Sequence, residues 1–155
     1  MWQDLYTRQI VGWAVESRMT AELVSKALLK AAHGGHLKAQ MILHTDQGSQ
    51  YAATAFRALL KAYELRQSMS RKGNCYDNAQ AESCFARFKA ELLEGGLFAD
   101  VAPARSETFS YIEGYYNRIR RHSALDYKSP LQFVKEHFQA KQERINSETL
   151  LSENT

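Results

Sequence analysis

The spacing of apolar residues predicts a strand followed by a helix near the start of the chain. Residues 8–16 (RQIVGWAVE) are rich in β-branched and aromatic side chains and lack helical spacing, which favours a strand. Thr20 is suited to cap a helix, because its hydroxyl can accept a hydrogen bond from a backbone N–H of the first turn. We expect this helix to end at residues 33–36 (HGGH), since glycine is common just past a helix C-terminus. The apolar stripe of the helix consists of Leu23, Val24, Ala27, Leu28 and Ala31.

A strand–helix–strand pattern follows. Residues 41–44 form a short apolar run that leads to Asp46 and a glycine-containing loop, which is typical of a buried strand in an α/β layer. Residues 51–63 carry apolar side chains at helical spacing and predict a helix, and residues 65–69 predict another short strand. Residues 70–76 (SRKGNCY) are polar and basic and predict a loop. The alternation of strands and helices indicates an α/β fold.

The remainder of the chain predicts helices only. Asp77 and Gln80 resemble a capping box that opens a helix extending to about Leu93. Residues 106–122 predict a long helix, and the Ser-Pro pair at 129–130 predicts the start of a short one, because proline suits the first helical turn. The predicted buried stripe of the first of these helices consists of Ala81, Phe85, Phe88 and Leu92.

Length and composition fit one globular domain with a polar tail. The 155 residues are 45% hydrophobic and 24% charged, which is ordinary for a soluble protein. We expect a core over residues 1–138 and a polar, partly disordered helical extension over residues 139–155. No apolar run approaches the roughly 20 residues that span a bilayer, and the first residues do not resemble a signal peptide. We therefore expect a cytoplasmic protein without a membrane partner, whose cysteines Cys75 and Cys84 are reduced.

Two acidic residues stand at positions where functional sites can form. Asp46 follows a predicted buried strand, and open α/β sheets place ligands at the carboxyl ends of their strands. Glu82 lies in the first turns of a predicted helix. The 35 residues from 47 to 81 separate the two, but a chain with 17 acids contains many such pairs. Composition alone therefore favours a structural or solvated role for either residue.

Local motifs change that interpretation. Residues 44–51 (HTDQGSQY) resemble the second-aspartate motif of the insertion-sequence transposases related to retroviral integrases. Residues 73–83 (GNCYDNAQAES) resemble the glutamate motif of the same family, and residues 4–13 (DLYTRQIVGW) resemble its strand pair before the first helix. Residues 111–130, which contain YYNRIRRHSAL and a Ser-Pro pair, resemble its terminal signature. Four motifs in the family's order are far more specific than any one of them, and together they cover about residues 4–134.

The resemblance implies a fold and a chemistry. The expected fold is an α/β, RNase H-like integrase catalytic core: an incomplete mixed sheet flanked by helices, with a helical C-terminal portion. Members of this family break and rejoin the phosphodiester bonds of DNA. Such reactions use two Mg²⁺ ions roughly 3.5–4 Å apart, held by oxygen ligands, and Mn²⁺ is a plausible substitute. By resemblance, Asp46 and Glu82 are two of the catalytic, metal-binding carboxylates.

The sequence departs from the family pattern at the first catalytic aspartate. In the family that residue lies on a strand upstream of the segment that residues 4–13 resemble. Asp4 matches instead the acid that begins the turn after the second strand, and Asp commonly initiates turns. We therefore expect an N-terminally truncated core that lacks its first strand or strands. The two-metal site is expected only in the complete domain, and the isolated chain is expected to be inactive.

Basic residues near the predicted site imply contacts with DNA. Lys89 lies two helical turns beyond Glu82 on the same side, and Arg71 and Lys72 lie in the loop before it. Such side chains can bind phosphates and release counterions, or, at a helix C-terminus, compensate the helix dipole. A further cluster at the end of the long helix consists of Arg118, Arg120, Arg121 and His122. Expected partners are DNA, at transposon ends and targets, and further copies of the chain or a full-length transposase.

Two alternative functions remain open at this point. The chain can be a non-catalytic DNA-binding or regulatory fragment that competes or dimerises with a full-length transposase. It can also be an unrelated RNase H-like nuclease that uses the same carboxylates, which would show as activity on RNA–DNA hybrids. Under the transposase reading, the protein acts in the bacterial cytoplasm on nucleoid DNA.

Overall fold

A two-stranded antiparallel hairpin begins the fold. The computed structural model describes residues 1–71, 79–93 and 98–153. Strand β1 (Trp2–Gln3) pairs with β2 (Ile10–Gly12). The turn between them is fixed by Asp4, whose Oδ1 accepts hydrogen bonds from the backbone nitrogens of Tyr6 at 2.9 Å and Thr7 at 2.7 Å. This confirms the turn-initiating role predicted for Asp4, while β2 is shorter than the predicted strand.

Helix α1 (Ala21–His33) packs closely against this hairpin. Its cap is the predicted one, because Thr20 Oγ1 accepts a hydrogen bond from Leu23 N at 3.2 Å. The helix ends at a turn in which Gly35 has a φ of 72°, a conformation that glycine adopts at little cost. Gly12 of β2 lies against α1 so tightly that a Cβ there would be 2.2 Å from Ala27 O. Only a residue without a side chain permits this approach of strand to helix.

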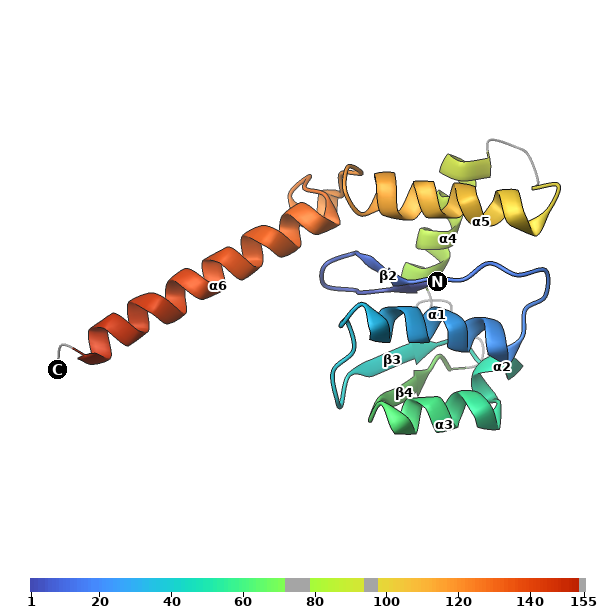
Figure 1. Ribbon diagram of the computed structural model, residues 1–155, viewed down its shortest axis with the longest axis horizontal. Helices are drawn as coiled ribbons and strands as arrows, with labels where there is room; N and C mark the ends of the chain where they lie inside the picture. The colour runs from blue at the N-terminus through green and yellow to red at the C-terminus, as the bar shows by residue number, and fades with distance from the viewer. Residues whose placement is uncertain (72–78, 94–97, 154–155) are drawn as a thin grey trace.

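Strands β3 (Ile42–Thr45) and β4 (Arg66–Met69) form a parallel pair. Both strands were predicted. The helix expected between them is instead two helices, α2 (Ser49–Ala52) and α3 (Thr54–Ala62), which are separated at Ala53 by an extended backbone with ψ of 138°. In Figure 1, α1 and α3 lie on either side of this pair of strands, as in an α/β layered fold.

The buried side of helix α4 (Ala79–Leu93) matches the predicted stripe only in part. Cys84 is buried, and Phe88 and Leu92 pack against the same cluster, whereas Phe85 is 42% exposed. The buried face of the helix therefore centres on Cys84, a small core residue. The proposed cap at Asp77 lies outside the described residues.

The C-terminal third is helical, as expected, but its boundaries differ. Helix α5 (Val101–Phe109) starts five residues before the predicted long helix, because Asp100 Oδ1 caps Val101 N at 2.6 Å. Pro103 lies in the first turn of α5, where proline is tolerated because backbone N–H groups there lack helical partners.

Helix α5 continues into a π-helical segment, η2 (Ser110–Tyr116), which no sequence signal predicted. A short 3₁₀ turn, η3 (Ser123–Leu125), follows. Helix α6 (Pro130–Glu153) starts where predicted, with Ser129 Oγ accepting a hydrogen bond from Gln132 N at 3.3 Å, and it runs as one helix through the predicted polar tail. Figure 1 shows α6 projecting away from the rest of the molecule.

Two hydrophobic clusters form the core. The first joins β2, α4 and η2, and the second joins α1, α3, β3 and Leu65, the residue before β4. Trp2 links the hairpin to the second cluster, since its ring stacks on Phe56 with centroids 6.1 Å apart. The architecture is therefore mixed α/β with a helical C-terminal portion, as the sequence predicted. Within the described ranges, no helix has the length and apolar character needed to cross a membrane.

Candidate functional site

Asp46 occupies the carboxyl end of β3. Its Oδ1 accepts a hydrogen bond from Gly48 N at 2.8 Å, which holds the side chain at the start of the loop before α2. The side chain is exposed. The next strand ends nearby, because Ser70 N donates a hydrogen bond to Thr45 O at 2.9 Å. Asp46 thus lies where two parallel strands end, the usual place for a ligand in an open α/β sheet.

His44 lies on the same strand and has two serine partners. Its Nδ1 lies 3.0 Å from Ser68 Oγ, and its Nε2 lies 3.1 Å from Ser70 Oγ, both across the parallel pair. The imidazole therefore ties β3 to β4 directly below the loop that carries Asp46. These contacts give His44 a structural role beside Asp46.

Glu82 lies in the first turn of α4 and is exposed. Seven residues on, Lys89 lies on nearly the same side of the helix, because seven residues at 3.6 per turn make almost two full turns. Lys89 is also exposed. The buried Cys84 lies on the opposite side of α4. Glu82 and Lys89 thus share a solvent-facing side of α4.

The two predicted metal ligands are on the surface, but no contact links them. In the described ranges, no hydrogen bond or ion pair joins Asp46 to Glu82, and no three His, Cys, Asp or Glu side chains cluster closely enough to hold a metal. Their meeting around a cation therefore stays a prediction. Both groups offer carboxylate oxygen, the donor type that Mg²⁺ prefers.

The basic cluster after η2 divides into exposed and engaged side chains. Arg118 and Arg121 are exposed. Arg120 forms hydrogen bonds with both carboxylate oxygens of Glu91 at 2.6–2.9 Å, and its side chain is only 15% exposed. Tyr111 Oη also donates to Glu91, at 2.7 Å. Arg120 therefore connects the end of η2 to α4, a role that sequence spacing did not indicate.

His122 is buried, with 6% of its surface exposed. The pKa of His122 is lowered from near 6.5 to about 4, mainly by burial and in addition by the positive charges of Arg120, Arg87 and Arg8. The imidazole is neutral at pH 7 and packs edge-on against the Tyr116 ring, with centroids 5.0 Å apart. This environment does not favour an ionic contact between His122 and a phosphate.

Of the two predicted loop cations, Arg71 is exposed, and Lys72 lies outside the described residues. Sequence reasoning missed Arg8 and Arg87, which approach Arg120 and His122 from two other segments. No periodicity or spacing signal pointed to them, because only the packing of the hairpin against α4 and the end of η2 brings them together.

Comparisons with known proteins agree with this arrangement. A family described as integrase core domain matches residues 1–75, and a second family with the same description matches residues 63–130. The transposase for insertion sequence element IS904 of Lactococcus lactis is 47% identical over 132 residues, which are 85% of this chain. Transposase InsF for insertion sequence IS3A of Escherichia coli is 45% identical over 130 residues, which are 84% of this chain. The chain belongs to the insertion-sequence transposases with an integrase core.

This transposase chain spans about half the length of the curated relatives it matches, 52% of the Lactococcus protein and 45% of the Escherichia protein. The fold is also that of retroviral integrases. The catalytic core domain of BIV integrase superposes with a TM-score of 0.55 at 18% identity, over 83% of this chain and 80% of that one. A chain of the simian T-cell lymphotropic virus intasome, solved with the PP2A regulatory subunit B56 gamma, gives 0.54 at 15% identity over 76% of this chain and 41% of that one. The family and fold predicted from the four motifs are confirmed.

Proposed function

We propose that this transposase chain supplies Asp46 and Glu82 as two carboxylate ligands of a metal-dependent site that cleaves DNA and transfers its strands. The observation that carries the proposal is the position of Asp46, which is exposed at the carboxyl end of a parallel strand pair and lies in the family's second-aspartate motif. Glu82 occupies the position of the family's glutamate, and its exposure supports the same role.

The donor chemistry suits Mg²⁺, with Mn²⁺ as a substitute. Asp46 and Glu82 would hold the metal, which when bound stabilises negative charge on phosphodiester oxygens and favours ionisation of an attacking hydroxyl or water. Asp46 is oriented for this role, because the Gly48 N–H fixes one carboxylate oxygen and leaves the other for a ligand. Glu82 is exposed on the solvent-facing side of α4, so it can bind a metal without any rearrangement of the core.

DNA is the proposed substrate, at transposon ends and at target sites, in the bacterial cytoplasm and nucleoid. Lys89 is the strongest candidate for a phosphate contact, because it shares the exposed side of α4 with Glu82. Arg118, Arg121 and Arg71 are exposed and can contribute further phosphate contacts. Lys72 remains a proposed contact from its place in the glutamate-motif loop. Association with a second copy or with a longer transposase is part of the proposal.

A third carboxylate is required by the family pattern, and no position of residues 1–155 matches it. We infer that these 155 residues do not cleave DNA by themselves. The proposal is best tested in a chimera, in which this chain replaces the segment of the Lactococcus transposase that it matches at 47% identity. The chimera also contains the parts of the Lactococcus transposase that lie outside that segment.

The expected result is Mg²⁺-dependent cleavage and strand transfer by the chimera, but not by the 155-residue chain. Asp46→Asn and Glu82→Gln should each reduce the rate by more than roughly a hundredfold, because even residues that only support metal ligands typically contribute 10- to 100-fold. Asp100→Asn is the matched control, since asparagine can still cap α5. An active chimera whose rate survives Asp46→Asn would overturn the proposal. Robust nicking by the 155-residue chain, abolished by Asp46→Ala, would refute the inference that this chain is inactive by itself.

A further inference from the structure

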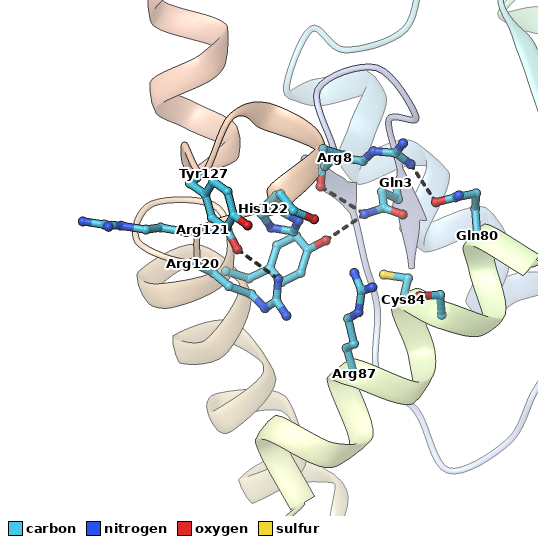
Figure 2. A pocket seen from close by; sticks show the side chains of 13 residues that line it. Gln3, Arg8, Gln80, Cys84, Arg87, Arg120, Arg121, His122 and Tyr127 are labelled. Carbon is cyan, nitrogen blue, oxygen red and sulfur yellow. Dashed lines mark hydrogen bonds between the residues drawn. The ribbon is translucent and has the colours of Figure 1, made fainter.

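A cavity of about 480 Å³ lies where the β1–β2 hairpin, α4 and the turn after η2 meet. Its lining is basic, and among the described residues that line it there is no Asp or Glu. The arginines of this lining are Arg8, Arg87, Arg120 and Arg121. Figure 2 shows the first three grouped around one hollow, whereas the side chain of Arg121 extends away from it. Cations collected in a recess raise the local concentration of anions.

Arg8 is held in place at both ends. Its backbone oxygen accepts a hydrogen bond from Gln3 Nε2 at 3.1 Å, and its guanidinium donates to Gln80 Oε1 at 2.7 Å (Figure 2). Gln3 is fixed in turn, because its Nε2 also donates a hydrogen bond to Tyr116 Oη at 2.7 Å. These contacts hold Arg8 in a left-handed backbone conformation, φ 59°, which disfavours most residues. The Arg8 charge is therefore positioned without being neutralised, because Gln80 is uncharged.

Arg87 and Arg120 complete the positive charge of the cavity. In the described ranges, the Arg87 guanidinium makes no hydrogen bond or ion pair. Glu91 pairs with Arg120 at 2.6 Å and offsets part of its charge. The cavity therefore keeps an excess of positive charge with guanidinium groups available to an anion. Guanidinium groups match phosphate oxygens well, since they donate two parallel hydrogen bonds.

His122 adds a second observation, independent of the arginine charges. Its side chain lines the cavity and is 94% buried, yet its Nε2 atom has no hydrogen-bond partner. A buried polar atom without a partner costs free energy unless a bound group satisfies it. In its neutral form the imidazole can carry its proton on Nε2 and donate it to an anionic oxygen once the side chains that cover this atom move apart.

The cavity lies on the opposite side of α4 from the proposed metal ligand. Gln80, Cys84 and Arg87 recur at intervals of four and three residues and line the cavity from one side of the helix. Glu82 is two residues from Cys84, which places it about 200° around the helix axis. An anion in the cavity would therefore not compete with a metal held by Glu82.

We propose that this arginine cavity binds a phosphate group of a DNA backbone, as a contact separate from the Asp46 and Glu82 surface. Arg8, Arg87 and the neutral imidazole of His122 donate to the phosphate oxygens, and Arg120 adds charge from its fixed position beside Glu91. DNA then touches both sides of α4. The choice of DNA as the phosphate source rests on the proposed function; the phosphate chemistry rests on the cavity alone.

The test is binding, not cleavage, so it does not depend on the metal site. Fluorescence anisotropy measures the affinity of the 155-residue chain for two duplexes of unrelated sequence over a range of KCl concentrations. Arg87→Gln should weaken binding to both duplexes by roughly tenfold and lower the salt slope by about one. Arg57→Gln is the matched control, because Arg57 is an exposed arginine of α3 outside the cavity, and it should change neither quantity comparably. In parallel, the His122 imidazole signals are followed by NMR during titration with a duplex and with inorganic phosphate.

Each outcome decides the matter. A His122 shift on adding duplex, together with selective weakening by Arg87→Gln, supports the proposal. The His122 signals can instead shift with inorganic phosphate while wild type and Arg87→Gln bind DNA equally well. That result identifies a small phosphate compound as the ligand and overturns the assignment to DNA. No shift with either probe, or no DNA binding by the chain, overturns the proposal. A chimera that binds DNA but does not cleave it refutes the proposed function and leaves this inference intact.

Discussion

The side-chain amide of Asn117 makes hydrogen bonds in both directions with the backbone of Ile10, 107 residues away in sequence. Asn117 Oδ1 accepts from Ile10 N at 2.9 Å, and Asn117 Nδ2 donates to Ile10 O at 3.0 Å. Both residues are 2% exposed. The backbone oxygen of Asn117 also accepts from Leu131 N at 2.9 Å. Asn117 therefore joins β2, the end of η2 and the start of α6, and it fixes the walls of the arginine cavity.

Replacing Asn117 should destabilise the fold strongly. Asn117→Ala leaves the N–H and C=O groups of Ile10 buried without partners, and each such group costs about 1–3 kcal/mol. We expect the free energy of unfolding to fall by about 3 kcal/mol in urea titrations followed by circular dichroism. Asn146→Ala is the control, since Asn146 is exposed on α6 and should change stability by less than about 0.5 kcal/mol. Equal losses in the two variants would contradict the assigned role.

Glycine is required at position 12 but not at position 114. In Gly12→Ala the new Cβ would lie 2.2 Å from the backbone oxygen of Ala27, so α1 and β2 must move apart, which we expect to cost about 1–3 kcal/mol. In Gly114→Ala the new Cβ meets nothing within 4 Å, and alanine favours helix over glycine by about 1 kcal/mol. Thermal unfolding should therefore move in opposite directions for the two variants. A tolerated Gly12→Ala would show that the packing of α1 on β2 is looser than described.

The elements that sequence predicted well are those encoded by neighbouring residues. Thr20 caps α1 through its own first turn, and the run before Asp46 forms a strand because it is apolar and short. The fold and the position of Asp46 followed from such local patterns combined with the family motifs. The π-helical segment, the pairing of Glu91 with Arg120 and the burial of His122 depend on contacts between distant segments. A count of basic residues after η2 therefore predicted one DNA-binding cluster, whereas packing divides it into exposed and engaged side chains.

The pairing of Glu91 and Arg120 should contribute more than an ordinary surface ion pair. Arg120 approaches both Glu91 oxygens and is largely buried, and these contacts lower the pKa of Glu91. A double-mutant cycle with Glu91→Gln and Arg120→Gln should give a coupling energy of about 1–2 kcal/mol in urea unfolding. The same cycle on the exposed pair of Glu22 and Lys26 should give a much smaller coupling. Comparable values for the two pairs would mean that Arg120 is not committed to α4 and is as available to DNA as Arg121.

His122 should make the protein less stable in mild acid. Its pKa is near 6.5 when unfolded and is lowered to about 4 in the fold, so the unfolded chain binds the proton more readily. The stability that follows from keeping the imidazole neutral is fully present above pH 6.5 and is lost as the pH falls from 6.5 towards 4. Between pH 7.5 and 5.5 this loss amounts to about 1 kcal/mol.

Urea unfolding at these two pH values, in buffers without phosphate, measures the effect. His122→Gln should reduce the difference in unfolding free energy by about 1 kcal/mol, because glutamine does not titrate. His33→Gln is the control, since His33 is exposed at the end of α1 and this variant makes the same replacement while keeping the His122 imidazole. Addition of inorganic phosphate or duplex DNA at pH 5.5 should stabilise the wild type more than Arg87→Gln, because only the wild type has the Arg87 guanidinium that donates to the bound phosphate. If the wild type is equally stable at both pH values, the fold does not lower the pKa of His122 as described.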